Sequence, residues 1–471
     1  MIVDRRSFIA ASAVSALVPS GANAVSGASL RPEDFGARGD GKTNDTRAFV
    51  ALAAEIQRRG GGSISLGARR TYIVGAQDRG DGPWGWNPSP IIKLDRLVLP
   101  LQILGNGARL RAQPGLRFGS FDLQSGNAVS HSMPNHELSD LASPYRAMIW
   151  LSNCSAPIIV RDIELDGNAE LLTIGGQFGD KGWQIPATGL LLRLNSHSET
   201  IENVLTHHHA LDGATFVGLP GRSARSRVSG LVSRFNGRQG LSITGGQGYD
   251  FANCEFSHTG RGAIHSAPGA GVDIEAEGRR TIRDLSFTRC KFVDNAGCGV
   301  VADSGDSDGA RFTDCTFVGT TSWSAWPRKP RFSFANCTFV GAVAHAFADP
   351  DPSRAAHFTA CRFTDDPTLS PTGKVFSGRA TGGPIANLAV SDNVTFDRCT
   401  FDLVGLAKLP TSQHAIYRDC VMRQRSSGPS SPRGTYLGQS TISGNVSLGG
   451  SMVEGDVALN GRRLARGRQG R

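Results

Sequence analysis

The sequence lacks three features that would place it in common classes of protein. No two of its nine cysteines are spaced as CxxC, which argues against a zinc or redox site of that kind, and an odd number leaves at least one thiol unpaired. No segment after residue 24 is apolar for the length of a transmembrane helix, so we expect no membrane span. It also lacks a basic cluster within its repeated part.

The distribution of basic residues argues against a nucleic-acid partner. The formal net charge is +9, but five arginines are concentrated in residues 460–471. A nucleic-acid-binding protein usually presents its basic residues together on a folded face. We therefore expect no nucleic-acid partner, and we expect residues 460–471 to form a disordered basic tail.

The first 24 residues have the three parts of an export signal in order. Arg5 and Arg6 precede the apolar run 10–18, and Ala22-Asn23-Ala24 offers a small-residue cleavage site. This segment resembles a twin-arginine signal peptide. The resemblance implies recognition by the twin-arginine export machinery and a mature protein in a bacterial periplasm or outside the cell.

A short apolar pattern containing Cys or an aliphatic residue recurs ten times along the chain. The clearest copies are FANCEF (251–256), FTRCKF (287–292), FTDCTF (312–317), FANCTF (334–339), FTACRF (358–363) and FDRCTF (396–401). Weaker copies begin at Val160, Ile201, Val228 and Tyr417. Most successive copies start 21–27 residues apart, and a period of this size indicates a solenoid.

The spacing inside each copy is typical of strands. Cys and the following aromatic are two residues apart, which on a strand points both side chains to one face. We predict one short strand in each coil of a parallel β-helix of about a dozen coils, covering residues 25–425 and continued by strands in 426–459. The ladder cysteines then point inward and act as small apolar residues: Cys254, Cys290, Cys315, Cys337, Cys361, Cys399 and Cys420.

The segment PEDFGARGDGKTNDTRAFVALAAEI (32–56) predicts a helix at the start of the solenoid. Asn44 or Asp45 can cap this helix, whose apolar face would cover the open end of the coils. With GGGSISLG (60–67) and TYIV (71–74), the segment resembles the opening motif of the pectate lyase superfamily. The resemblance implies an all-β, right-handed parallel β-helix with a short N-terminal capping helix, and action on a polysaccharide.

The chain departs from the best-known members of that superfamily. Polygalacturonases carry Gly-Asp-Asp, Gly-His-Gly and Arg-Ile-Lys steps, and none of these occurs here. Their catalytic residues cannot be transferred. A candidate site has to come from the outward-facing residues of the coils themselves.

Alignment of four strands by their apolar residues predicts a row of outward carboxylates. The strands are GATFVG (213–218), GLSITGG (240–246), GVDIEAEG (271–278) and GVVADSG (299–305). Asp273 falls in one column with Thr215, Ser242 and Val301. Glu275 falls in the next column, beside Asp303.

Two carboxylates so placed have two possible chemical uses. Outward residues two apart on a strand are about 6.6 Å apart, and neighbours across coils are about 5 Å apart, which suits acid and base catalysis and should raise one pKa. Alternatively, Asp273, Glu275 and Asp303 could bind Ca²⁺. His265 would join them as a catalytic acid or base, and Arg238 and Arg261, expected on the same side, would bind the substrate.

Three further residues are candidates for substrate binding. Adjacent residues on a strand alternate faces, so the run His207-His208-His209 cannot all bind one ion, and one of them, assigned here as His208, should face the substrate together with Asp212. Trp326 should stack on a sugar ring, because its column passes Asp273.

We expect an exported enzyme that cleaves or modifies a polysaccharide. A lyase acting on a uronate-containing glycan is favoured by the family resemblance. An inverting glycoside hydrolase on the same fold is the alternative, and a non-catalytic carbohydrate-binding or surface-structural β-helix is the other class.

Export should depend on the arginine pair. Changing Arg5 and Arg6 together to Lys should leave the protein in the cytoplasm, because the export receptor reads that pair. Cell fractionation followed by immunoblotting measures this, with Arg462 and Arg463 changed to Lys as the control. Normal export of the Arg5/Arg6 variant would indicate a general secretory signal.

Overall fold

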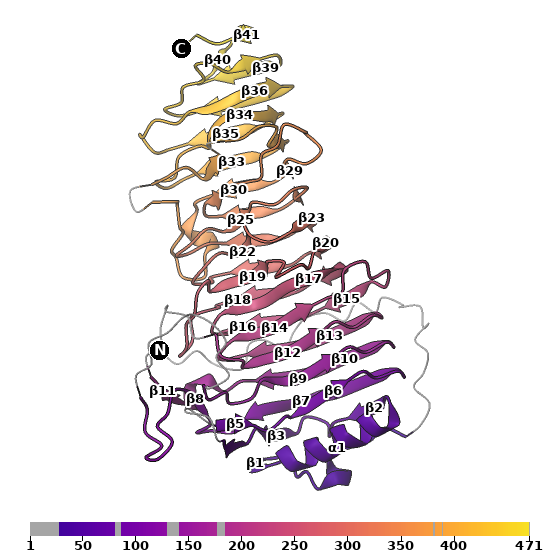
Figure 1. Ribbon diagram of the computed structural model, residues 1–471. Helices are drawn as coiled ribbons and strands as arrows, with labels where there is room; N and C mark the ends of the chain where they lie inside the picture. The colour runs from indigo at the N-terminus through magenta and orange to yellow at the C-terminus, as the bar shows by residue number, and fades with distance from the viewer. Residues whose placement is uncertain are drawn as a thin grey trace.

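The chain folds into a right-handed parallel β-helix, seen in a computed structural model that describes residues 28–80, 86–129, 141–176, 184–379, 382–388 and 390–470. Figure 1 shows the coils stacked from the indigo N-terminal end to the yellow C-terminal end. The predicted export signal lies outside these residues. Among the described residues, no helix is long and apolar enough to cross a membrane.

Each coil in the middle of the stack contributes three short strands. One coil has β20 (Ile282–Thr288), β21 (Lys291–Val293) and β22 (Val300–Ala302). The strands pair in parallel and in register with β23 (Ser307–Thr313), β24 (Thr316–Val318) and β25 (Ala325–Pro327) of the next coil. Equivalent residues of successive coils therefore stack in columns.

The recurring motif spans a corner between two strands, which corrects the prediction of one strand per copy. The residue before each ladder cysteine has a left-handed backbone, as at Asp314 (φ 55°) and Asn336 (φ 53°). That conformation ends the first strand and turns the chain. Asn and Asp tolerate it best, but Arg289, Ala360 and Arg398 adopt it too, at a cost of about 1–2 kcal/mol each.

The ladder cysteines point inward at these corners, as predicted, and all nine cysteines are free and buried. Each ladder thiol from Cys290 onward donates to the carbonyl of the first aromatic in the preceding coil's motif. Cys315 Sγ lies 3.4 Å from Phe287 O, and Cys337 Sγ lies 3.5 Å from Phe312 O. A thiol thus fills a small apolar space and also satisfies a corner carbonyl.

Two columns of aromatic rings fill the interior beside the thiols. In one column Phe287 stacks on Phe312 with ring centroids 4.9 Å apart, and in the other Phe292 stacks on Phe317 at 4.6 Å, with rings nearly parallel in both pairs. Phe317 also meets Phe312 edge-on at 5.7 Å. The rings are fully buried, so each phenylalanine contacts its own coil and both neighbours.

The helix predicted near the N-terminus is α1 (Thr46–Arg59), which covers the first coils (Figure 1). Its predicted apolar face is buried, and Phe49 meets Tyr72 edge-on at 5.2 Å. Asn44 Oδ1 accepts a hydrogen bond from the Thr46 N–H. The Asp45 carboxylate instead accepts from the N–H groups of Arg38 and Gly39, which fastens the preceding loop.

The other end of the stack differs from the predicted disordered tail. Strand β40 (Arg462–Arg463) pairs antiparallel with β39 (Asp456–Leu459), and β41 (Gly467–Arg468) pairs antiparallel with β38 (Met452–Val453). An ion pair joins Arg463 to Asp456. Three of the arginines that suggested disorder, Arg462, Arg463 and Arg468, are exposed residues of these last strands.

Removal of one ring from a column should destabilise the solenoid. Phe317→Ala should lower the free energy of unfolding by about 3–5 kcal/mol, because it opens a cavity in contact with three coils. Urea unfolding followed by circular dichroism measures this. Leu369→Ala, at a 42% exposed residue, is the control and should change stability by less than about 0.5 kcal/mol. Equal midpoints for the two variants would contradict the packing argument.

Candidate functional site

The predicted row of outward residues lies on the sheet formed by the third strand of successive coils. In parallel register, β14 (Asp212–Val217) pairs with β17 (Gln239–Ala252), which pairs with β19 (Ala270–Ile274); β22 and β25 follow. One column runs through Thr215, Ser242, Asp273, Val301 and Trp326. The alternate side chains, such as Leu241 and Val272, are fully buried inside the coil. The register of this column and the outward direction of its side chains are as predicted.

Asp273 is nearly enclosed although it points away from the coil interior. Only 8% of the residue is exposed, and Asp273 Oδ2 accepts a 2.7 Å hydrogen bond from Gln239 Nε2. Gln239 is itself braced, because its Oε1 accepts from the Ala270 N–H. Burial, followed by the charge of Glu275, raises the pKa of Asp273 to about 8, although Arg238 opposes the shift. The carboxyl therefore keeps its proton at neutral pH.

Arg238 and Asp212, both predicted to bind substrate, form a buried ion pair with each other. Arg238 Nε and Nη2 donate to Asp212 Oδ1 and Oδ2 at 2.8 and 2.6 Å, and the Asp212 carboxylate is fully buried. Thr215 Oγ1 also donates to Asp212, and Arg238 Nη1 donates to Gln184. Arg238 is already paired with Asp212, so it does not form an ion pair with Asp273.

Glu275 and Asp303 lie just beyond the ends of their strands. The pairing of β19 with β22 stops at Asp273 and Val301, so the predicted cross-coil neighbours are no longer held by a strand ladder. Glu275 is half-buried and accepts a 2.6 Å bond from Ser304 Oγ, whereas Asp303 is exposed. The charges of both raise the pKa of Asp273. Of these three carboxyl groups, Asp273 is thus the one whose pKa is raised, which is the shift predicted for clustered carboxylates.

An apolar cluster borders Asp273 on the side of the later coils. Ala270, Cys298 and Val301 are buried there, and Trp323 and Trp326 pack against them. Two buried polar atoms of this sheet, Thr244 Oγ1 and Trp326 Nε1, have no hydrogen-bond partner among the described residues. The row therefore presents a protonated acid, a second carboxylate and an aromatic surface on one face of the coil.

Three predicted residues lie in other surroundings. Arg261 Nη2 donates to Asp294, Thr320 and Thr321, at 3.2, 2.9 and 2.6 Å. His265 packs over Gly260, where an added β carbon would come within 2.8 Å of the ring. His208 lies at a corner beside His207. The insertion 265–271 and the corner turns redirect these side chains, which alignment of strands alone does not reveal.

Residues that the sequence argument missed include Gln239, Gln184 and Ser304. Gln239 had a usable signal, because it occupies the position of Asp212 in the aligned coils and the two are register partners. Gln184 and Ser304 lie in loops, whose course is not repeated from coil to coil.

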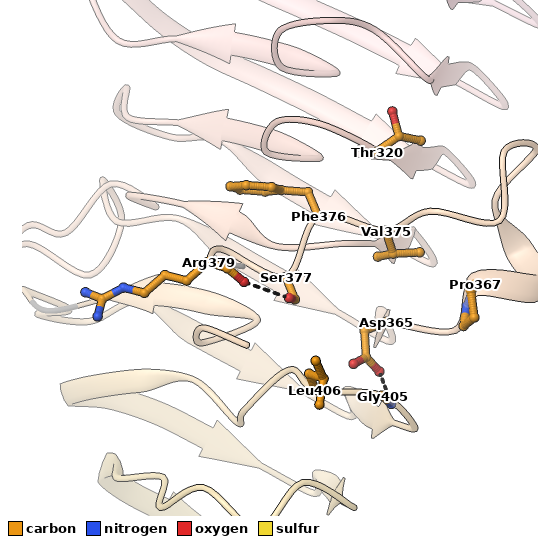
Figure 2. A pocket seen from close by; sticks show the side chains of 9 residues that line it. All are labelled: Thr320, Asp365, Pro367, Val375, Phe376, Ser377, Arg379, Gly405 and Leu406. Carbon is orange, nitrogen blue, oxygen red and sulfur yellow. Dashed lines mark hydrogen bonds between the residues drawn. The ribbon is translucent and has the colours of Figure 1, made fainter. Parts of the chain in front are cut away.

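Figure 2 shows a surface pocket of about 430 Å³ that lies elsewhere, around Asp365, Phe376, Ser377 and Leu406. The Asp365 carboxylate accepts hydrogen bonds from the backbone N–H groups of residues 404, 405 and 407. In Figure 2 the Arg379 side chain points away from Asp365. This carboxylate fastens a loop, and the pocket does not bring an acid and a base together.

The possible metal ligands also differ from the prediction. Among the described residues, the group whose ligand atoms all lie within 4.8 Å of one another is Asp166, His207 and His208. Asp273, Glu275 and Asp303 do not form such a group. A carboxyl that retains its proton is a poor ligand for Ca²⁺, which binds ionised carboxylates.

Comparisons with known proteins agree with the fold. A family model described as "Right handed beta helix region" matches residues 149–339. A search of curated proteins found no match. The N-terminal fragment of bacteriophage phi29 gene product 12 is 13% identical, with a TM-score of 0.50, over 93% of this chain and 73% of its own. The fold and the outward row together define a right-handed parallel β-helix protein with a candidate acid on one sheet.

Two enzymes are also similar in structure, at low identity. The A-module of mannuronan C-5 epimerase AlgE6 from Azotobacter vinelandii is 14% identical, covers 92% of this chain and 98% of its own, and has a TM-score of 0.40. An exopolygalacturonase from Thermotoga maritima is 14% identical, covers 94% and 95%, and has a TM-score of 0.34. At such identities the likeness concerns the fold alone.

The raised pKa of Asp273 predicts a pH-dependent stability. Between the ordinary value of 3.8 and about 8, the folded protein holds a proton that the unfolded chain has released, so the free energy of unfolding falls as pH rises through this window. The slope from this group is at most about 1.4 kcal/mol per pH unit. Asp273→Asn should remove it and be more stable than wild type above pH 8. Urea unfolding from pH 5 to 9 measures this, and a variant-minus-wild-type difference independent of pH would contradict it.

Proposed function

We propose that this protein is an exported enzyme that cleaves a polysaccharide bound along the outward row, with Asp273 as the proton donor. The observation that carries the proposal is a carboxyl that points out of the coil, is nearly enclosed and has a pKa of about 8. An acid of this kind is what departure of a sugar oxygen requires at neutral pH. The resemblance of residues 32–56 to the opening motif of the pectate lyase superfamily supports a polysaccharide as the substrate.

Hydrolysis is the reaction that the side chains favour. Asp273 would donate its proton to the glycosidic oxygen, while Glu275 would accept a proton from the attacking water. Glu275 follows the last residue of β19 and is two residues from Asp273, and residues two apart in an extended chain are about 6.6 Å apart, within the range of about 6.5–9.5 Å used by inverting hydrolases. Trp323 and Trp326 would carry sugar rings.

Elimination from a uronate is the second candidate. A neutral Asp273 can lie against an anionic sugar without charge repulsion, which favours a uronate as the bound ring. A lyase also needs a base to take the proton next to that carboxylate. Arg238 is bound to Asp212, and Arg261 is bound to Asp294, so neither arginine is available to act as that base. Hydrolysis therefore ranks ahead of the lyase expected from the sequence.

The proposal predicts that activity and stability separate at Asp273. Asp273→Asn and Glu275→Gln should each reduce turnover about 10²–10⁴-fold, the usual contribution of a general acid or base. At pH 6 Glu275→Gln should keep the wild-type unfolding midpoint, and Asp273→Asn should be at least as stable as wild type, because it removes the pH-dependent loss described above. Asp314→Asn, at an exposed corner where Asn suits the left-handed backbone, removes a carboxylate elsewhere and should retain full activity.

The assay uses polygalacturonate, alginate and neutral plant and bacterial glycans, and records new reducing ends together with ultraviolet absorbance from unsaturated uronates. Reducing ends without absorbance indicate hydrolysis, and equal growth of both indicates a lyase. Hydrolytic rates should fall above about pH 8, where Asp273 loses its proton. Wild-type rates in both variants would refute this site. Binding of a glycan without turnover would identify a carbohydrate-binding protein.

A further inference from the structure

Asp166 and His207 occupy one corner in neighbouring coils. They are the last residues of β10 (Ile158–Asp166) and β13 (Glu199–His207), and the parallel register of these strands sets them side by side. Asp166 Oδ1 lies 3.7 Å from His207 Nδ1, and both residues are buried. A carboxylate and an imidazole thus face each other where the strands end.

His208 brings a second imidazole to the same corner. Strand alternation would send adjacent side chains to opposite faces, but His208 has a left-handed backbone with φ of 53°, and its ring turns back towards His207. The two Nδ1 atoms are 2.6 Å apart. The argument from alternation therefore fails for this pair, although His209 is separate and hydrogen-bonds to Tyr145.

Glu164 sets the ring of His207 for metal binding. His207 Nε2 lies 2.9 Å from Glu164 Oε1, and Glu164 is paired with Arg109 at 2.7 Å. Because the carboxylate accepts a hydrogen bond from Nε2–H, the lone pair of a neutral His207 lies on Nδ1, facing Asp166 and His208. A carboxylate behind an imidazole is the usual outer partner of a metal-binding histidine.

His208 is held in place by stacking. Its ring lies on Phe235 with centroids 5.2 Å apart and planes 12° apart, and Phe235 lies in turn on His258 at 4.7 Å.

We propose that Asp166, His207 and His208 form a binding site for a divalent transition-metal ion, with Zn²⁺ as the best fit. Two imidazole nitrogens and one carboxylate oxygen are donors that zinc accepts, whereas Ca²⁺ prefers oxygen alone. The three ligand atoms lie within 4.8 Å of one another. This site is independent of the catalysis proposed for Asp273, because no residue is shared.

The site needs a small adjustment to accept the ion. Zinc–nitrogen bonds of about 2.0–2.1 Å in a tetrahedral arrangement separate two nitrogens by about 3.3 Å, so the imidazoles must move apart by less than 1 Å. The His208 side chain is 28% exposed, which leaves room for this movement and for water as the fourth ligand. Because the ligands come from two coils, the bound ion joins those coils.

Titration of the untagged, chelator-treated protein with ZnCl₂ tests the proposal. Calorimetry should detect one bound equivalent, and excess Zn²⁺ should raise the thermal unfolding midpoint, because the ion binds the folded state. Co²⁺ in place of Zn²⁺ should give visible absorption bands of a nitrogen-ligated ion. Failure of the wild-type protein to bind either ion would refute the site.

Variants assign the ion to these residues. Glu164→Gln should weaken Zn²⁺ binding about 10–100-fold, and His208→Gln or Asp166→Asn should weaken it further. His414→Gln is the matched control, because exposed His414 also lies 2.7 Å from an aspartate, Asp392, but has no second imidazole. Circular dichroism verifies folding. Wild-type affinity in folded Asp166→Asn and His208→Gln, or equal loss in His414→Gln, would overturn the assignment.

Discussion

The parallel hydrogen-bond ladder between successive coils is the interaction on which the rest of the structure depends. It holds equivalent residues of successive coils about 4.8 Å apart, so each side chain lies directly against the side chains at the same position in the coils above and below. In the columns of phenylalanine rings and at the cysteine corners, the same residue type recurs in successive coils. Each ring packs on an identical ring, and each thiol bonds to a carbonyl of the preceding coil.

The same ladder places unlike residues together on the outer face. Asp273 is enclosed between Ser242 and Val301 because its neighbours in the column are fixed by register. Two coils earlier, Asp212 has a cation within reach and forms a buried ion pair with Arg238. Among the described residues, the hydrogen-bond partner of the Asp273 carboxyl is the amide of Gln239. Two buried carboxyl groups on one sheet thus differ in their surroundings, because one of them is paired with an arginine.

Those features that follow from the repeat could be predicted from the sequence, and those that depend on corners and loops could not. The column through Ser242, Asp273 and Trp326 follows from counting residues between apolar positions, and the same column is present in the structure. The position of His208 depends on one left-handed residue. The pairing of Arg238 with Asp212 depends on a long side chain whose direction no repeat specifies. The ordered last strands were missed because arginine content was taken as a sign of disorder.

The antiparallel strands at the C-terminal end have a consequence for self-association. A solenoid of parallel strands is a template for its own growth, because the last coil offers the same edge groups that bind each earlier coil. Strands β40 and β41 run in the opposite direction and carry exposed arginines, so the edge they leave neither continues the register nor attracts another basic chain end. The α1 helix covers the other end. At both described ends, the stack therefore presents a poor template for the addition of another parallel coil.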